Sequence, residues 1–463
     1  MQQIFGTTPD GSSPRLMVLA RITIAAALIG VAISYSVIYL YHLALVLLIV
    51  TAAVEAWRGT WLRRLPDGSH RFLYVMAAWY AASIAWSIAP LYSVQYLFYL
   101  FCGTALTLAT LYSARDERSL RRVVRTAGIV IAIEVGFSLL EAFTPFRLPV
   151  SPYSEIVHYF GRDSVIEGTL DQRVIQQFLS SPTGFQWNPN DLAATLVIFL
   201  PFCLLHRSPA LRYCGATSIL VVIFFTGSRA SYIAVAVVFA VWGLAFHLRR
   251  AVIVLGLAVA AVLLTPSAIQ TMKTSDNPRI AELAALSEVL TAFLAGSATS
   301  GDSVGLRREL IHNGLEALRE SPLLGVGGGA SIAVQERAGG AAARIRSMHN
   351  FWIEVMVDSG VIMGGLFIGW YAWLLARCYR VALFTRRPYL RYVSTALVCS
   401  MSGFAIAMVS SSSVIYVLPM WFMYGLVCAV LNIDRSMVGE PRSEPLTPHP
   451  SAIHPGSSAA APA

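Results

Sequence analysis

Charged side chains are scarce in this sequence. Asp, Glu, Lys and Arg make up 13% of its 463 residues, whereas they make up roughly a quarter of a soluble globular domain. Hydrophobic residues account for 56%, and the mean hydropathy is +0.63. This composition excludes a soluble globular protein and indicates a polytopic membrane protein.

Cysteine is also rare. The six cysteines all lie inside apolar runs or at run ends that we place in the cytoplasm, so we expect no disulfide framework. The sequence has no GxxxxGK[ST] loop, no HExxH and no CxxC motif. Nucleotide hydrolysis and zinc chemistry therefore have no support.

The formal net charge of +9 does not indicate nucleic-acid binding. The basic residues are almost all arginines at the ends of apolar runs, which is the pattern that sets membrane topology. Clusters of arginine predict that the loops 57–71, 113–126 and 377–391 are cytoplasmic.

The apolar runs predict an all-α fold with twelve transmembrane helices, because about 20 residues span a bilayer. We place them near 17–36, 38–56, 72–90, 94–112, 127–144, 190–206, 212–227, 230–247, 251–268, 350–376, 392–410 and 412–432. In domain terms, 1–16 is a cytoplasmic N-terminus, 17–268 carries helices one to nine, 350–432 carries helices ten to twelve, and 433–463 is a disordered cytoplasmic tail.

Two long segments then lie outside, on the periplasmic side: 145–189 and the large loop 269–349. Within the large loop, Leu310, Ile311, Leu315 and Leu318 recur at helical spacing, which predicts an amphipathic helix on the outer leaflet. Residues 282–294 are a second, weaker case.

Three of the helices that begin at the outer face have polar beginnings. The sixth opens with FQWNPNDLAA, in which Asn188 or Asn190 can cap, Pro189 suits the first turn and Asp191 suits the helix dipole. The eighth opens after TGSRASY, with Arg229 at the boundary. The tenth opens with MHNFWIE, where His349 precedes Asn350, a plausible cap.

Helix N-termini and an arginine together suit a phosphate or diphosphate, because backbone N–H groups and a guanidinium fork both donate to the anion. This pattern predicts a site for a lipid-linked phosphate. Arg307 in the large loop could close over the same place, and its neighbour Arg308 is a substitute. His349 offers two ring nitrogens for proton transfer.

Each of these residues also has a structural interpretation. Arg229 alone reads as an interfacial arginine, Asn188 to Asp191 as a helix cap, and His349 as an interface histidine. The glycines of GVGGG most simply allow a sharp turn. Glu354 and Asp358 are harder to dismiss, since ionisable groups inside a membrane are rare. They could orient His349 or bond to neighbouring helices.

The motifs TGSRASY, Arg307 followed by ESPLLGVGGG, and HNFWIEVMVDSGVIMGG resemble those of the O-antigen ligase/polymerase superfamily of bacterial envelope enzymes. This superfamily includes lipopolysaccharide O-antigen ligases and the polymerases of O-antigen and exopolysaccharide repeat units. The likeness covers roughly residues 72–432.

The resemblance implies a metal-independent glycosyltransferase without cofactors in the bacterial inner membrane, with an undecaprenyl-diphosphate-linked glycan as donor. It implies Arg229 and Arg307 as diphosphate-binding residues, His349 as the catalytic residue, and Asp358 as the acidic residue after His-Asn. We add Asn190, Asn350 and Glu354 as supporting residues. Ile311 stands where the superfamily usually has an aromatic residue, which leaves Arg307 and Arg308 both open.

The acceptor stays open between a lipid-linked repeat unit, for a polymerase, and lipid A-core, for a ligase. We favour a polymerase, because the segment 145–189 with Tyr153, Tyr159, Phe160 and Trp187 could hold a growing glycan, although a ligase could use it for core sugars. A chain-length regulator protein is a further candidate partner. A flippase for the same lipid is a more distant alternative. The clustering of the polar residues at one face argues against it.

Overall fold

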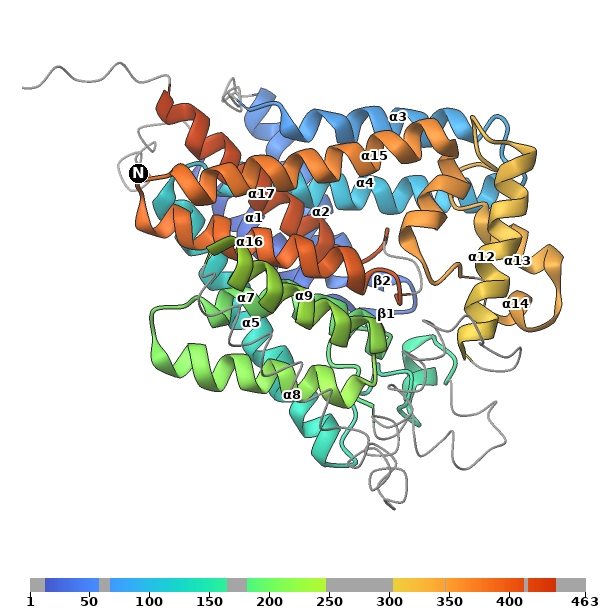
Figure 1. Ribbon diagram of the computed structural model, residues 1–463, viewed down its shortest axis with the longest axis horizontal. Helices are drawn as coiled ribbons and strands as arrows, with labels where there is room; N and C mark the ends of the chain where they lie inside the picture. The colour runs from blue at the N-terminus through green and yellow to red at the C-terminus, as the bar shows by residue number, and fades with distance from the viewer. Residues whose placement is uncertain are drawn as a thin grey trace, which may run out of the picture.

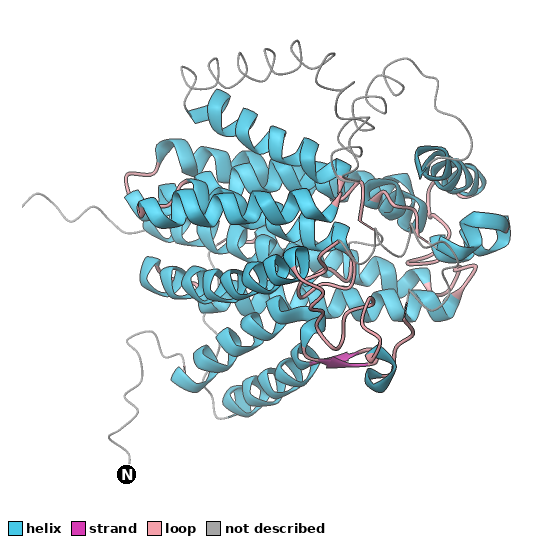
Figure 2. Cartoon of the chain, turned by 90° about the horizontal axis from the view of Figure 1, so that it is seen from below, coloured by secondary structure: helices cyan, strands magenta, loops and turns pink. Residues whose placement is uncertain are grey.

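The computed structural model describes residues 13–57, 67–164, 181–246, 303–345, 347–411 and 415–438. The expected helix at 251–268, the segment 282–294 and the tail beyond 438 lie outside these residues. Nearly all of the described chain is helical, and one short hairpin is its only β structure (Figures 1 and 2).

The N-terminal half carries these elements in order: α1 Pro14–Ile29, η1 Gly30–Ala32, β1 Ser34–Tyr35, β2 Ile38–Tyr39, α2 Leu40–Trp57, η2 Ser69–Arg71, α3 Phe72–Ser83, α4 Pro90–Ser113, α5 Glu117–Phe143, η3 Val157–Phe160, α7 Pro189–Leu204, η4 Leu211–Gly215, α8 Ala216–Thr226 and α9 Arg229–Phe246. The two strands pair antiparallel, with Ser34 opposite Tyr39.

The C-terminal half carries α12 Ser303–Glu320, α13 Ser331–Ala338, α14 Gly340–Ile345, α15 Phe351–Phe384, α16 Pro388–Ala407 and α17 Leu418–Val438. The amphipathic helix predicted around Leu310 is confirmed as α12. It packs against α15 and α13 and buries Leu310 and Leu318, whereas Leu315 is exposed.

A helix lies at every predicted span that the described residues include. By length and composition, seven helices among the described residues suffice to cross a membrane: α1 with η1, α2, α4, α5, α9, α15 and α16. The helices α7 and α8 are apolar but shorter. The protein is therefore a multi-pass membrane protein, and the count of twelve spans stays a prediction.

Several helix ends differ from the prediction; α3, for example, ends at Ser83 rather than at 90, and α17 begins at Leu418 rather than at 412. Helix α1 ends at Gly30, whose φ of 55° leaves the helical region, rather than at residue 36. Helix α5 begins at Glu117 rather than at 127, because Asp116 and Ser119 form a capping box. Helix α15 runs to Phe384. Most arginines of the predicted loops 113–126 and 377–391 thus lie on helix ends, where long side chains can reach beyond the apolar span.

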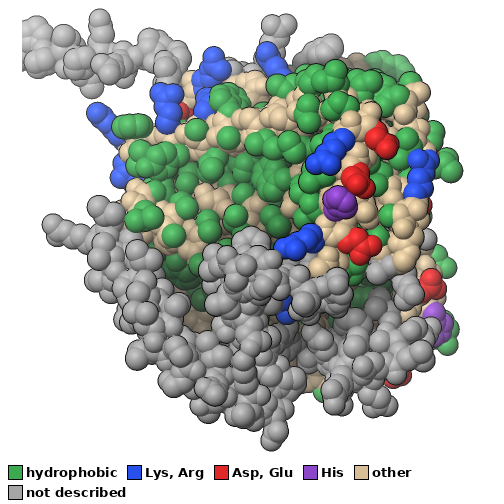
Figure 3. Space-filling view, turned by 45° about the vertical axis from the view of Figure 1, so that its right-hand side comes forward, with side chains coloured by type: hydrophobic (Ala, Val, Ile, Leu, Met, Phe, Trp, Pro, Cys, Tyr) green, Lys and Arg blue, Asp and Glu red, His purple; other side chains and the backbone are tan. Residues whose placement is uncertain are grey.

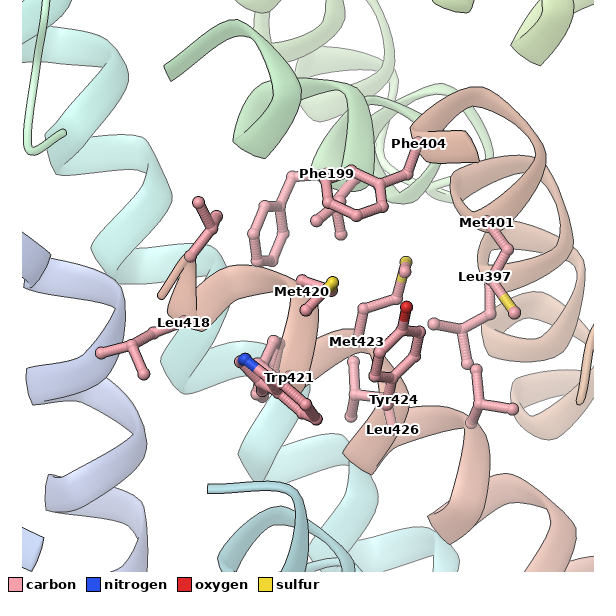
Figure 4. Close-up of a cluster of buried hydrophobic side chains, with 14 of the residues drawn as sticks. Phe199, Leu397, Met401, Phe404, Leu418, Met420, Trp421, Met423, Tyr424 and Leu426 are labelled. Carbon is pink, nitrogen blue, oxygen red and sulfur yellow. The ribbon is translucent and has the colours of Figure 1, made fainter. Parts of the chain in front are cut away.

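The core is organised around α17. From Met420 to Ile433, every apolar side chain of this helix is buried, as expected of a helix that is hydrophobic on all faces. Met420, Met423 and Tyr424 lie in a cluster with Phe199 of α7 and Phe404 of α16 (Figure 4). Large apolar side chains on the outside, such as those of α2 and α5, remain exposed and form the surface that lipid would cover.

Three of the arginine-bearing segments meet at one end of the bundle, which we call the arginine end. Asp67 accepts a hydrogen bond from Arg377 at 2.7 Å, and the Arg121 guanidinium lies 4.0 Å from the ring centre of Tyr389. Arg387 also lies within 4.0 Å of Glu117. The loops 57–71, 113–126 and 377–391 therefore share one side, as the arginine pattern predicts.

The opposite end carries the hairpin, the loops before α7 and α15, and helices α12 to α14 (Figures 1 and 2). We call it the loop end. In Figure 3, hydrophobic side chains dominate the described surface between the two ends, while acidic, basic and histidine side chains gather toward them. This distribution suits a bundle that crosses a bilayer with one end on each side.

Cysteine labelling can test the predicted orientation, in which the loop end faces the periplasm and the arginine end faces the cytoplasm. Arg319 on α12 and Arg386 after α15 are exposed at opposite ends. With Cys203 and Cys214 replaced by serine, the four remaining cysteines are buried. In spheroplasts, an impermeant maleimide should label Arg319→Cys before detergent is added and Arg386→Cys only afterwards. The reverse order would overturn the orientation.

Candidate active site

His349 stands immediately before α15, held by the end of α16. Asn350 is the N-cap, since its side-chain oxygen accepts from the Ile353 N–H at 3.3 Å, as predicted. The Phe351 N–H donates to the Met408 carbonyl at 3.2 Å, and the Trp352 indole N–H donates to the Ala405 carbonyl at 2.9 Å. The first turn of α15 is thereby fixed to the last turn of α16.

The backbone of His349 has a φ of 45°, which is uncommon for a residue other than glycine and marks a conformation held by its surroundings. Its Nδ1 lies 3.3 Å from the carbonyl oxygen of Ser410. A carbonyl can only accept, so Nδ1 carries the proton and Nε2 keeps its lone pair in the neutral ring.

The pKa of His349 is lowered from its ordinary value. Burial of the ring is the largest cause and the positive charge of Arg307 is the second, while the bond to the Ser410 carbonyl opposes them. The imidazole is therefore neutral at pH 7, the form that can accept a proton.

Ser410 joins the histidine to two other predicted site residues. Its hydroxyl accepts a hydrogen bond from Arg307 at 3.1 Å and donates to the side-chain oxygen of Asn190 at 3.3 Å. Side chains from α12, α7 and the segment before α15 thus converge on one buried serine. The sequence analysis missed Ser410, which lies in a run of serines without a motif.

Arg229 is the first residue of α9 and lies beside Arg307. The chain turns at Gly227, whose φ is 68°, and the hydroxyls of Ser228 and Ser231 lie 3.0 Å apart across the turn. Burial and then the charge of Arg229 lower the pKa of Arg307. Neither arginine forms a salt bridge with any residue that the structure describes.

Two adjacent guanidiniums that lack a carboxylate partner form a favourable place for an anion with several oxygens. Of the two candidates on α12, Arg307 reaches this place, whereas Arg308 is exposed. The arrangement thus combines a neutral histidine base with two cations on separate helices.

The start of α7 is positioned by acids within α5. Asn188 is the N-cap, accepting from the Asn190 N–H at 2.8 Å, and Pro189 is the first helical residue, as predicted. Upstream, the Glu141 carboxylate accepts from the N–H groups of Thr183 and Gly184 at 2.8 and 2.7 Å. These bonds hold the loop that leads to Asn190.

Glu134, two turns earlier in α5, holds the same loop. Its carboxylate accepts from the Gln186 amide at 3.0 Å. A backbone bond also ties this loop to the end of α1, since the Phe185 carbonyl accepts from the Val31 N–H at 2.9 Å. The sequence analysis missed Glu134 and Glu141. The indication was present, because both are acids within an apolar helix, as Glu354 and Asp358 are.

Asp358 docks the glycine-rich loop. Its side chain accepts from the Ser331 N–H at 2.9 Å, and its backbone carbonyl accepts from the Gly327 N–H at 3.0 Å. Its hydrogen bonds therefore go to α13 and the loop before it, rather than to His349. Glu354 is buried beside Tyr80.

The glycines of the loop make the turn that we expected, and Gly325 and Gly329 have a φ of 71°. A β-carbon on Gly325 would collide with the backbone nitrogen of Gly360. Gly360 itself has a φ of 78° and kinks α15 at this contact. The loop and the kinked helix can approach this closely only because both residues are glycines.

One comparison with known protein families matches a segment of the chain that contains three of these site residues. Residues 214–368 match the family model described as O-antigen ligase, which confirms the resemblance drawn from the motifs. The match runs from η4 into α15 and includes Arg229, Arg307 and His349, whereas Asn190 and Ser410 lie outside it. No curated protein matches the chain.

A stability experiment can test the role of Glu141. Glu141→Leu would leave two buried N–H groups without their acceptor, at about 1–3 kcal/mol each. Glu141→Gln keeps a carbonyl oxygen that can accept both bonds, so this variant should lose clearly less stability than Glu141→Leu. Thermal unfolding in detergent should rank wild type, Gln and Leu in that order, with the exposed Glu155→Leu unchanged. Wild-type stability of Glu141→Leu would contradict this role.

Proposed function

We propose that the protein is an inner-membrane glycosyltransferase that transfers a glycan from an undecaprenyl-diphosphate-linked donor to a sugar hydroxyl on the periplasmic side. The observation that carries the proposal is the paired Arg229 and Arg307 beside a neutral His349. The O-antigen ligase match over the same segment supports a transfer reaction of this kind.

In this proposal the arginines bind the diphosphate of the donor. A planar guanidinium offers paired donors that match phosphate oxygens, and the N-terminus of α9 adds backbone N–H groups to the same place. As the bond between the anomeric carbon and the phosphate oxygen breaks, negative charge develops on that oxygen. Arg229 and Arg307 stabilise this charge, and undecaprenyl diphosphate leaves.

His349 acts as the general base. Its Nε2 takes the proton of the acceptor hydroxyl while the hydroxyl oxygen forms the new bond to the anomeric carbon. A single displacement of this kind inverts the configuration at that carbon. The step that we propose requires no nucleotide or metal, because the leaving diphosphate is part of the donor and the arginines balance its charge.

The acceptor decides between two forms of the reaction. With a second lipid-linked glycan the protein is a polymerase of O-antigen or exopolysaccharide repeat units. We favour this form because the segment 145–189 could hold a growing glycan. With lipid A-core it is an O-antigen ligase. The same three residues would serve both reactions, because the donor half of the step is identical.

Reconstitution in nanodiscs tests the proposed function. The purified protein would receive a lipid-linked repeat unit, once alone and once with rough lipopolysaccharide. We expect a ladder of longer glycans without lipopolysaccharide, and transfer only in its presence would indicate a ligase. Arg307→Lys should lose most of the product because an ammonium lacks the fork, whereas the exposed Arg308→Lys should retain it. Failure of the wild type under both conditions would refute the proposal.

The pH dependence tests His349. A base must be deprotonated, and the pKa of His349 is lowered, so activity should hold at neutral pH and fall as the pH drops through a pKa below the ordinary histidine value. His349→Gln should lose about 10²–10⁴-fold and show no such fall. The exposed His312→Gln on α12 is the matched control and should behave as wild type. Near-normal turnover by His349→Gln would remove the base role.

A further inference from the structure

A cavity at the loop end lies beside the candidate active site. It has a volume of about 420 Å³, within the range of small-molecule sites, about 300–1,000 Å³. Its walls come from the β1–β2 hairpin, α2, α4, the loop after η3, and the two chain segments on which the active site depends. The lining residues that matter below are Tyr39, His42, Tyr99, Arg162, Trp187 and Tyr416.

The cavity adjoins the active site through α7 and the start of α17. Trp187 precedes Asn190 by three residues, and Tyr416 lies beside the buried Asp191. Asn190 in turn bonds to Ser410. The cavity and the candidate active site therefore share the chain segment that leads into α7.

Aromatic rings line the cavity and are held in fixed orientations. The rings of Tyr39 and His42 are stacked with centres 5.2 Å apart, and those of Tyr99 and Tyr416 meet edge to face at 6.0 Å. Such rings offer flat, electron-rich faces. The C–H groups on one side of a pyranose ring carry a small positive charge and pack well on such a face.

Arg162 joins two of the walls. Its guanidinium lies 4.8 Å from the ring centre of Trp187 and 5.5 Å from that of Tyr39, and its Nε donates to the Ser36 carbonyl at 2.9 Å. The Ser36 N–H also donates to the Phe160 carbonyl at 2.7 Å. These contacts fix the hairpin against the loop after η3, so the rings are positioned before a ligand arrives.

Polar groups of both kinds face the cavity among the rings. The Tyr39 N–H donates to Nδ1 of His42 at 3.1 Å, so Nε2 carries the proton of the neutral ring and can donate. Asp163 offers a carboxylate that can accept, and tyrosine hydroxyls can do either. A ligand with many hydroxyl groups needs this mixture, whereas an acyl chain does not.

We propose that this cavity is a saccharide subsite that holds a pyranose ring of the glycan next to the sugar that reacts. The inference rests on the proposed function, since the glycan in the cavity would be part of a donor or acceptor bound at the active site. The ring belongs either to the acceptor or to the donor, and these two sources share the chemistry described above.

Saturation-transfer NMR can test the subsite. The probe is a lipid-free oligosaccharide of one repeat unit from the surface polysaccharide of the source cell, added to the protein in nanodiscs. Wild type should transfer saturation to the sugar ring protons. Trp187→Leu and Tyr99→Leu, on different lining segments, should each weaken binding about two- to tenfold, and Trp187→Tyr should recover much of it. Tyr35→Leu, exposed on the hairpin but outside the lining, is the control.

Transfer assays on the same variants separate the two sources. A higher KM for the acceptor alone assigns the ring to the acceptor, and a higher KM for the donor alone assigns it to the donor. The proposal is overturned if both folded leucine variants bind the oligosaccharide as wild type does, or if they change only the binding of phospholipid. Should Trp187→Leu fail to fold, Tyr99→Leu decides.

The outcomes also distinguish this inference from the proposed function. A wild type that transfers glycan normally while the leucine variants bind it unchanged refutes the subsite alone. A wild type that binds the oligosaccharide through these rings but transfers nothing refutes the proposed reaction and leaves the subsite standing.

Discussion

The junction between the end of α16 and the beginning of α15 determines the geometry of the site. A carbonyl at the end of a helix lacks an intrahelical partner. Here the oxygens of Ala405 and Met408 at the end of α16 receive bonds from the first residues of α15, and that of Ser410 just beyond receives one from His349. The satisfaction of these backbone groups and the placement of His349 are therefore one requirement. A shift of either helix along its axis would break both.

The fold followed largely from composition and apolar runs. The positions of the membrane helices and the shared side of the arginine loops were predictable because hydropathy and charge act locally. Helix ends were not, because they depend on individual backbone groups. The capping box at Asp116 extends α5, and the positive φ of Gly30 ends α1 early. The apolar runs alone indicate neither the capping box at Asp116 nor the positive φ of Gly30.

The candidate site was only partly predictable. Arg229, Arg307 and His349 carried recognisable motifs, and the structure brings them together. Ser410 could not have been found, because its importance comes from what three separate segments place around it. Glu141 could have been found from its position in an apolar helix, but which N–H groups it serves depends on tertiary contacts with a loop forty residues away in sequence.

The position of Arg307 on α12, outside the membrane helices, has a thermodynamic consequence. Without an anion, the charge of Arg307 is buried close to that of Arg229, and this repulsion works against the docking of α12 on the bundle. An anion between the two guanidiniums replaces the repulsion by two attractions. In the proposed function, anion binding and docking of α12 are therefore linked equilibria, and part of the intrinsic affinity for the anion offsets the cost of holding this helix in place.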